Sequence, residues 1–115
     1  MDALLKSRNV KFIVAIYPDA FQIDKNLLNE IAGRFQLNIE DYDLDLAQNI
    51  LTSFLRSKDI SYIDLTDRFR SESREKNLYL LRDPHWNRPG NELAANILFA
   101  TLVERLDNIN RLYSH

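Results

Sequence analysis

Apolar residues form two short runs that predict β-strands. The first runs from Val10 to Tyr17, is β-branched and aromatic with only Lys11 interrupting it, and is stopped by Pro18. A run this continuously apolar predicts a strand covered on both faces, as in the interior of a parallel sheet. The second run, residues 60–65, is shorter and predicts another strand.

Apolar positions elsewhere recur with helical spacing. Asp24 is a good N-cap for a helix whose apolar stripe ends at Phe35, although Gly33 is unfavourable inside it. Residues 2–8 predict the end of a helix, and residues 37–41 a connection. A further helix is expected over residues 43–58. It would place these residues on its core-facing side: Leu44, Ala47, Leu51, Phe54 and Leu55.

The last third of the chain alternates between polar and apolar segments. Thr66 or Asp67 is expected to cap a short polar helix through Arg70, and residues 71–77 predict a charged, mobile surface loop. Residues 91–106 are apolar around most of a helical circumference, so this helix should be largely buried. Residues 107–115 are polar enough to fray.

Two strands joined through helices predict a right-handed parallel crossover in a single α/β domain. A parallel sheet buried on both faces normally needs more than two strands. The first strand therefore has the character of an inner strand without one of its neighbours. Either the chain is part of a larger domain, or it completes its sheet by association.

The composition limits the kinds of partner that this chain is expected to bind. With 15 Lys and Arg against 17 Asp and Glu, the net charge of −2 provides no basic excess for nucleic acid or anionic lipid. The absence of cysteine excludes disulfides and thiolate metal sites and leaves the compartment open. No stretch has the apolar length of a signal peptide or a membrane span, so this piece is expected to be soluble by itself, whereas the parent protein could be extracytoplasmic.

Candidate chemistry lies in residues 78–90, between an apolar run and the last predicted helix. Pro84 favours an extended Asp83, and residues i and i+2 of an extended segment point to the same side, so Asp83 and His85 can meet. This is the orienting half of an acid, base and nucleophile relay. Asn87 is a candidate N-cap, and Gly90 permits close approach of helix and sheet. His85 would then lie beside a helix N-terminus, whose positive dipole end favours the neutral imidazole.

Residues 83–90, Asp-Pro-His-Trp-Asn-Arg-Pro-Gly, lead into the Ala-rich start of the last predicted helix. This block resembles the final sequence block of the SGNH, or GDSL-type, hydrolase superfamily. The Asp-x-His-Trp form is similar to the subgroup that includes alginate and polysaccharide O-acetylation proteins, while Asp-x-x-His is the more frequent spacing. The resemblance implies a partial flavodoxin-like, three-layer fold with parallel strands and flanking helices.

The resemblance covers the second half of that fold. The Gly-Asp-Ser nucleophile block and the Gly and Asn of the family's oxyanion hole are missing, and no serine lies on a strand-to-helix turn with small neighbours. The resemblance therefore implies that residues 1–115 are the C-terminal half of a larger SGNH-like domain. By itself this half is expected to be inactive.

The resemblance implies that His85 is the general base and that Asp83 orients it. Trp86 could form a wall of the substrate pocket or plug the core, and Tyr17 could line the same edge. Other interpretations stay open: His85 could cap or pack, and Asp83 could cap the helix or pair with a neighbouring arginine. Asp64, at the end of a strand, is a weaker alternative acid or a helix cap.

Two functions follow as hypotheses. In the first, the parent is a serine esterase or O-acetyltransferase acting on an O-acylated small molecule or polysaccharide, with no cofactor. In the second, the chain is a non-catalytic α/β association module that pairs with itself or with the missing N-terminal half. No metal site is expected, because Asp83 and His85 are only two ligands and His115 lies at the terminus.

Overall fold

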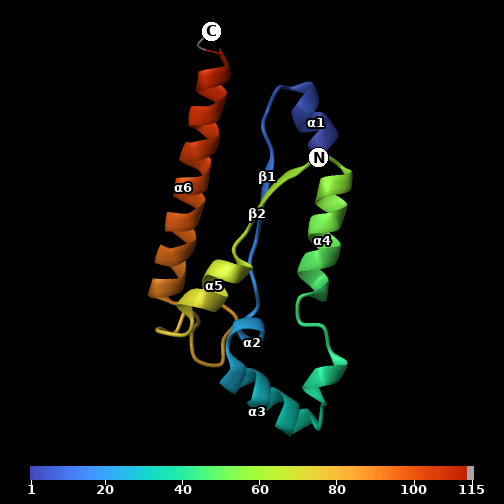
Figure 1. Ribbon diagram of the computed structural model, residues 1–115, viewed down its shortest axis with the longest axis vertical. Helices are drawn as coiled ribbons and strands as arrows, with labels where there is room; N and C mark the ends of the chain where they lie inside the picture. The colour runs from blue at the N-terminus through green and yellow to red at the C-terminus, as the bar shows by residue number, and fades with distance from the viewer. Residues whose placement is uncertain (114–115) are drawn as a thin grey trace.

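The computed structural model describes residues 1–113, and its elements follow one another in the order helix, strand, helices, strand, helices. Figure 1 shows this arrangement. The elements are α1 (Asp2–Ser7), β1 (Ile13–Ile16), α2 (Ala20–Ile23), α3 (Lys25–Phe35), the 3₁₀-helix η1 (Ile39–Asp41), α4 (Leu46–Ser57), β2 (Ser61–Asp64), α5 (Thr66–Glu72) and α6 (Arg88–Tyr113).

The sheet consists of β1 and β2, which pair in parallel with Ile13 opposite Ser61 and Ile16 opposite Asp64. The helices α4 and α6 stand on opposite sides of the two strands (Figure 1). This confirms the predicted α/β class, with parallel strands between flanking helices. Both strands are shorter than the apolar runs that predicted them, and within residues 1–113 they pair only with each other.

The hydrophobic core lies at the carboxyl end of the strands, where α2, α5 and the start of α6 meet. Phe69 and Leu65 are fully buried, and Leu78 is almost so. The short helix predicted through Arg70 is present. The expectation that it is polar was wrong, because its Phe69 lies at the centre of the core. Phe69 packs there against the rings of Tyr79 and Trp86, whereas Arg68 is exposed and Arg70 is partly exposed.

Helix caps account for several boundaries. The predicted cap of α3 is confirmed, because the carboxylate of Asp24 accepts hydrogen bonds from the amides of Asn26 and Leu27, at 2.9 and 3.1 Å. At α5 the expected caps Thr66 and Asp67 were wrong, whereas the interpretation of Asp64 as a helix cap is confirmed. The carboxylate of Asp64, not Thr66 or Asp67, accepts the first free amide, that of Thr66, at 2.9 Å.

The predicted inner face of α4 was right at Leu55, which is buried, and wrong for most of the rest. The side chains that α4 buries are Gln48, Thr52 and Leu55, whereas Phe54 is 53% exposed and Leu51 is also exposed. A two-stranded sheet is too narrow to cover a full apolar helix face. The buried Gln48 is instead satisfied by a reciprocal amide pair with Gln22, at 2.9 and 3.0 Å.

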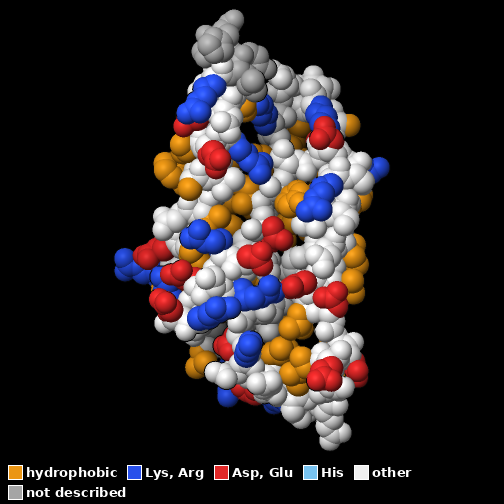
Figure 2. All heavy atoms as spheres, viewed as in Figure 1, with side chains coloured by type: hydrophobic (Ala, Val, Ile, Leu, Met, Phe, Trp, Pro, Cys, Tyr) orange, Lys and Arg blue, Asp and Glu red, His pale blue; other side chains and the backbone are white. Residues whose placement is uncertain are grey.

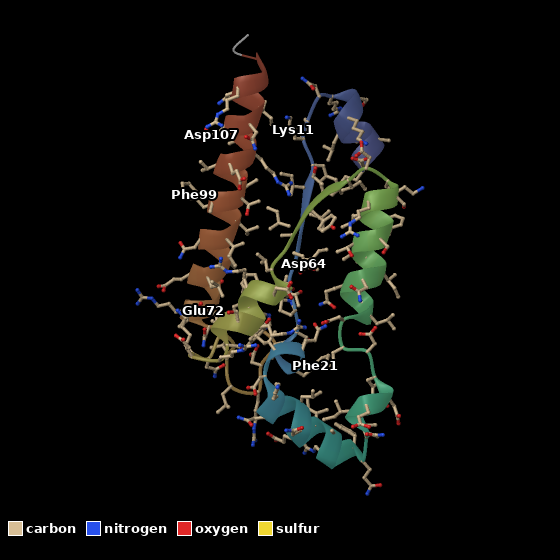
Figure 3. The ribbon with its side chains drawn as sticks, in the orientation of Figure 1. Lys11, Phe21, Asp64, Glu72, Phe99 and Asp107 are labelled. Carbon is tan, nitrogen blue, oxygen red and sulfur yellow. The ribbon has the colours of Figure 1, made fainter. Side chains whose placement is uncertain are left out.

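Helix α6 is longer and less buried than the sequence predicts. It begins at Arg88 and continues through the tail that was expected to fray, as far as Tyr113. Its first turns bury Leu93 and Ala94, but Phe99 is 72% exposed and lies on the side away from the strands (Figure 3). The apolar circumference of this helix therefore lacks the neighbours that its composition predicts. No helix in the described part of the chain is long and apolar enough to span a membrane.

Candidate active site

Residues 78–87, here called the motif loop, form a hairpin between α5 and α6. The backbone amide of Asn87 donates to the Leu78 carbonyl at 3.0 Å, and that of Leu80 donates to the His85 carbonyl at 2.9 Å. Tyr79 and Trp86 form an antiparallel bridge between these two bonds. Arg82 adopts the left-handed conformation, with φ of 56°, where the chain reverses. The loop is thus fixed by its own backbone.

A tyrosine ties the motif loop to the sheet. The buried hydroxyl of Tyr79 donates a hydrogen bond to the carbonyl of Pro18, just after β1. Burial raises the pKa of this phenol to about 12, so it remains a donor at neutral pH. Sequence analysis did not identify Tyr79 as a site residue, although its place in the apolar run before Asp83 was the available signal.

The start of α6 holds the other end of the loop. Asn87 accepts the Gly90 amide at 3.0 Å through its side-chain oxygen, and its NH₂ group donates to the carbonyls of Asn77 and Tyr79, at 2.8 and 3.2 Å. A Cβ at Gly90 would collide with the Leu78 carbonyl oxygen. The predicted cap and the predicted close approach are both confirmed, with the loop rather than the sheet as the neighbour of Gly90.

Asp83 and His85 meet as the extended geometry predicts. One carboxylate oxygen of Asp83 accepts the backbone amide of His85 at 2.8 Å and lies 2.5 Å from its Nδ1. Hydrogen bonding from that amide, and then from the imidazole, lowers the pKa of the Asp83 carboxyl. The acid therefore stays ionised at neutral pH and favours the tautomer that carries its proton on Nδ1.

The other ring nitrogen of His85 is available. Its side chain is 81% exposed, and within residues 1–113 no hydrogen bond occupies Nε2. The alternative pairing of Asp83 with Arg88 is not formed, because Arg88 pairs with Glu92 at 2.8 Å. An exposed imidazole held through Nδ1 can accept a proton at Nε2, as a general base requires.

Trp86 connects this site to the core. Its ring lies 5.4 Å from that of Phe69 and packs edge-on against Tyr17 at 4.9 Å. Trp86 is partly buried while Tyr17 is 56% exposed at the end of β1. The structure thus brings Tyr17 and Trp86 into contact with each other, and Trp86 follows His85 directly in the chain. Trp86 packs on the core, and the exposed Tyr17 packs against its ring.

A large hollow of 1830 Å³ opens on another side of the motif loop. It lies against α2, α3 and the segment before the loop, and it reaches Asp83 and Pro84. His85, Trp86 and Tyr17 do not line it. The imidazole therefore faces open surface rather than this hollow.

The other candidate groups lie elsewhere. Asp64 is engaged as the cap of α5. Ser73, nearest in sequence among the serines, donates instead to the carbonyls of Arg70 and Ile23, at 2.9 and 3.2 Å. Among residues 1–113 no serine forms a hydrogen bond with His85, and no group of three or more His, Asp or Glu could hold a metal ion. His115 lies outside the described residues.

Comparison with known proteins agrees with the motif and the topology. A family model described as the SGNH hydrolase-like domain of the acetyltransferase AlgX matches residues 1–113, nearly the whole chain. No curated protein and no solved structure gives a significant match. The match spans the parallel strands, the flanking helices and the motif loop together. The chain therefore belongs to the family of SGNH hydrolase-like domains of the AlgX type.

Proposed function

We propose that this hydrolase- and acetyltransferase-like domain contributes the acid and base of a catalytic triad that acts on O-acetyl groups. His85 is the general base, and Asp83 orients it and stabilises its protonated form. The nucleophile is a serine from a segment that these 115 residues do not contain. The substrate class is an O-acylated small molecule or polysaccharide.

The observation that supports this proposal most strongly is the contact between Asp83 and Nδ1 of His85, at 2.5 Å, together with an exposed Nε2. A carboxylate on Nδ1 leaves Nε2 as the proton acceptor, which is the division of roles in an acid, base and nucleophile relay. Pro84 and the cap at Asn87 hold both residues on a short, hydrogen-bonded loop, so little conformational freedom is lost when substrate binds.

The proposed chemistry has two steps. The serine oxygen forms a bond to the acetyl carbonyl carbon while Nε2 of His85 takes the hydroxyl proton, and the resulting imidazolium then gives this proton to the departing alcohol oxygen as its bond to the acetyl carbon breaks. The acetyl-enzyme is released by water, giving acetate, or by a sugar hydroxyl, giving transfer. His85 takes the proton of either acceptor and returns it to the serine.

The pair formed by the exposed Tyr17 and the partly buried Trp86 supports a role in substrate contact. Tyr17 and Trp86 lie edge to face at 4.9 Å next to the motif loop, and a flat ring can cover an acyl or sugar group. Tyr17 is the more accessible of the two and would make this contact. Trp86 would hold Tyr17 in place through its packing on Phe69.

Activity measurements test separately the two parts of the proposal, the nucleophile outside this chain and the roles of His85 and Asp83. The 115-residue protein is expected to leave an unactivated acetyl ester, such as an O-acetylated sugar, unchanged. In the parent protein, His85→Ala is expected to reduce kcat by about 10⁴-fold or more, and Asp83→Asn by a similar or smaller factor. Release of acetate by mass spectrometry measures both.

Arg82→Ala is a matched control, because Arg82 adjoins Asp83 on the same loop but contacts neither ring nitrogen. It should retain activity. Turnover by the 115-residue protein that His85→Ala abolishes would contradict an external nucleophile. Full activity of the parent carrying His85→Ala would contradict the role of His85.

A further inference from the structure

The buried side chain of Tyr79 contacts the neighbours of two side chains that the proposed function uses. Its hydroxyl donates to the carbonyl of Pro18, which directly follows Tyr17. Its backbone forms the bridge with Trp86, which directly follows His85. One tyrosine therefore connects the backbone beside the proposed aromatic contact with the backbone beside the proposed base.

The indole nitrogen of Trp86 is a buried donor without an ordinary partner. Its Nε1 forms no hydrogen bond of normal geometry within residues 1–113. Tyr79 and Trp86 face each other between two backbone hydrogen bonds of the hairpin, and side chains approach most closely at such a position. Burial raises the pKa of Tyr79 to about 12, and hydrogen bonding by the Trp86 indole acts against this rise. The indole N–H therefore lies beside the phenol.

The chemistry of these groups allows hydrogen bonds in one direction only. An indole N–H can only donate and a carbonyl oxygen can only accept, whereas a phenol does both at once. Because Tyr79 already donates to Pro18, its oxygen keeps lone pairs with which to accept the Trp86 N–H. An unpaired buried donor is costly, so a small rotation that aligns the indole with the phenol is favoured. The indole of Trp86, the hydroxyl of Tyr79 and the carbonyl of Pro18 are here called the tyrosine link.

Aromatic packing holds the tyrosine link from below and at its rim. The fully buried Phe69 packs against the rings of Tyr79 and Trp86, at 6.3 and 5.4 Å between ring centroids. The ring of Tyr17 meets that of Trp86 edge-on at 4.9 Å. Tyr17 is thus held both through the ring of Trp86 and through the backbone of its neighbour Pro18.

The tyrosine link is buried, unlike much of the surface around it. Figure 2 shows hydrophobic atoms spread over several elements of the visible face, where a further segment could still make contact. By contrast, Pro18 is fully buried and Tyr79 is 5% exposed. The geometry of the link is therefore set by contacts within this chain.

We propose that Tyr79 is a positioning residue for the reaction proposed above. Its hydroxyl accepts from the indole of Trp86 and donates to the carbonyl of Pro18. These two bonds fix where the ring of Tyr17 lies relative to the imidazole of His85. The positioning role rests on the proposed function, whereas the tyrosine link itself does not. Such placement matters because a displacement of about 1 Å between reacting groups can cost about 100-fold in rate.

Nuclear magnetic resonance of the 115-residue protein tests the link without any activity. Trp86 is the only tryptophan, so its indole N–H gives a single signal. We expect this proton to exchange slowly in the wild type and about ten-fold faster or more in Tyr79→Phe, which keeps the ring but removes the acceptor. Tyr62→Phe is the matched control, because its hydroxyl accepts from Arg56 at 2.8 Å and is not part of the link. It should leave the indole exchange unchanged.

Kinetics of the parent protein test the positioning role. Tyr79→Phe is expected to lower kcat about five- to ten-fold and to change KM by about two-fold or less, because the substrate contact is kept but misplaced. In a Tyr17→Ala background, the same change should lower kcat by about two-fold or less, since no ring remains to be placed. A purely structural role of Tyr79 would give the same factor in both backgrounds.

The outcomes distinguish a failure of this inference from a failure of the proposed function. Fast indole exchange in the wild type, or equal exchange in Tyr79→Phe, would overturn the tyrosine link, and the wild-type measurement needs no variant. Equal kinetic factors in the two backgrounds would overturn the positioning role even if His85→Ala abolishes turnover. Full activity of His85→Ala would overturn the proposed function and with it the positioning role, whereas the indole result would stand.

Discussion

The motif loop and the outer part of α6 differ in how far the chain completes them. In the loop, Asn87 engages both atoms of its amide, Tyr79 bonds to Pro18, and Asp83 bonds to His85. Beyond its first turns, α6 exposes Phe99 and other large apolar side chains. The polar groups of the motif loop named above thus find their partners within the chain. The outer part of the helix that follows leaves its apolar side chains exposed.

The difference reflects the range of the interactions. A hairpin with a helix cap needs partners only a few residues away, and one long-range bond from Tyr79 fixes it to the sheet. An apolar helix face needs a surface as wide as itself, which two strands do not provide. The motif loop can therefore be held by its own contacts although the helix that follows it exposes apolar side chains.

Replacing the phenylalanine of α5 that packs against the motif loop, and the one on the outer part of α6, should give the largest contrast. Phe69→Ala is expected to lower the free energy of unfolding by about 3–5 kcal/mol, because Phe69 is fully buried against Tyr79 and Trp86. Phe99→Ala removes the same atoms from an exposed position and should change it by about 0.5 kcal/mol or less. Urea unfolding measures both, and equal losses would contradict the contrast.

Glycine substitutions test the close contact inside the loop. Gly90→Ala should destabilise the protein by about 1–3 kcal/mol, since the methyl group would collide with the Leu78 carbonyl. Gly33→Ala meets nothing within 4 Å in α3, and should stabilise the protein by about 0.5–1 kcal/mol through helix propensity. Thermal unfolding of both variants gives opposite signs if the contact is as described. Two shifts of the same sign would argue against it.

The bond between Tyr79 and Pro18 should have a smaller effect. Tyr79→Phe keeps the packed ring but leaves the Pro18 carbonyl without its donor, at a cost of about 1 kcal/mol. Amide exchange of Leu80 and Asn87, whose amides hold the loop, should become faster at the same time. Unchanged exchange would mean that the loop does not depend on this bond.

Replacing the Asp83 carboxyl should give the smallest effect, and this effect should depend on pH. Its pKa in the folded protein lies below the ordinary value of 3.8, so its contribution to stability is present above about pH 4 and is lost as the pH falls through the folded-state pKa. Asp83→Asn should lower stability slightly at neutral pH and flatten this acid dependence. An identical acid dependence in wild type and variant would place the effect on another carboxyl.

Local chemistry made the motif loop predictable. Pro84 and the alternation of an extended segment predicted that Asp83 and His85 meet, and Asn87 and Gly90 predicted the helix start. The fold class followed from the two apolar runs and the helical spacing between them. Each of these inferences depends on a few neighbouring residues, which the sequence contains in full.

Which side chains are buried was less predictable, because burial depends on elements that are distant in the sequence. Phe69 stands between two arginines in a polar segment, so nothing nearby indicated that it would be fully buried. The apolar stripes of α4 and α6 predicted buried faces, but the narrow sheet leaves them exposed. In α4 the buried polar residue Gln48 is possible only because Gln22, 26 residues earlier, pairs with it.

The central claim is that Asp83 holds the His85 imidazole with Nε2 free to accept a proton. Nitrogen chemical shifts of His85, at a pH where the ring is neutral, report directly which nitrogen carries the proton. We expect Nδ1 to be protonated in the wild type and the preference to be lost in Asp83→Asn. A proton on Nε2 in the wild type, or the same tautomer in both proteins, would contradict the claim.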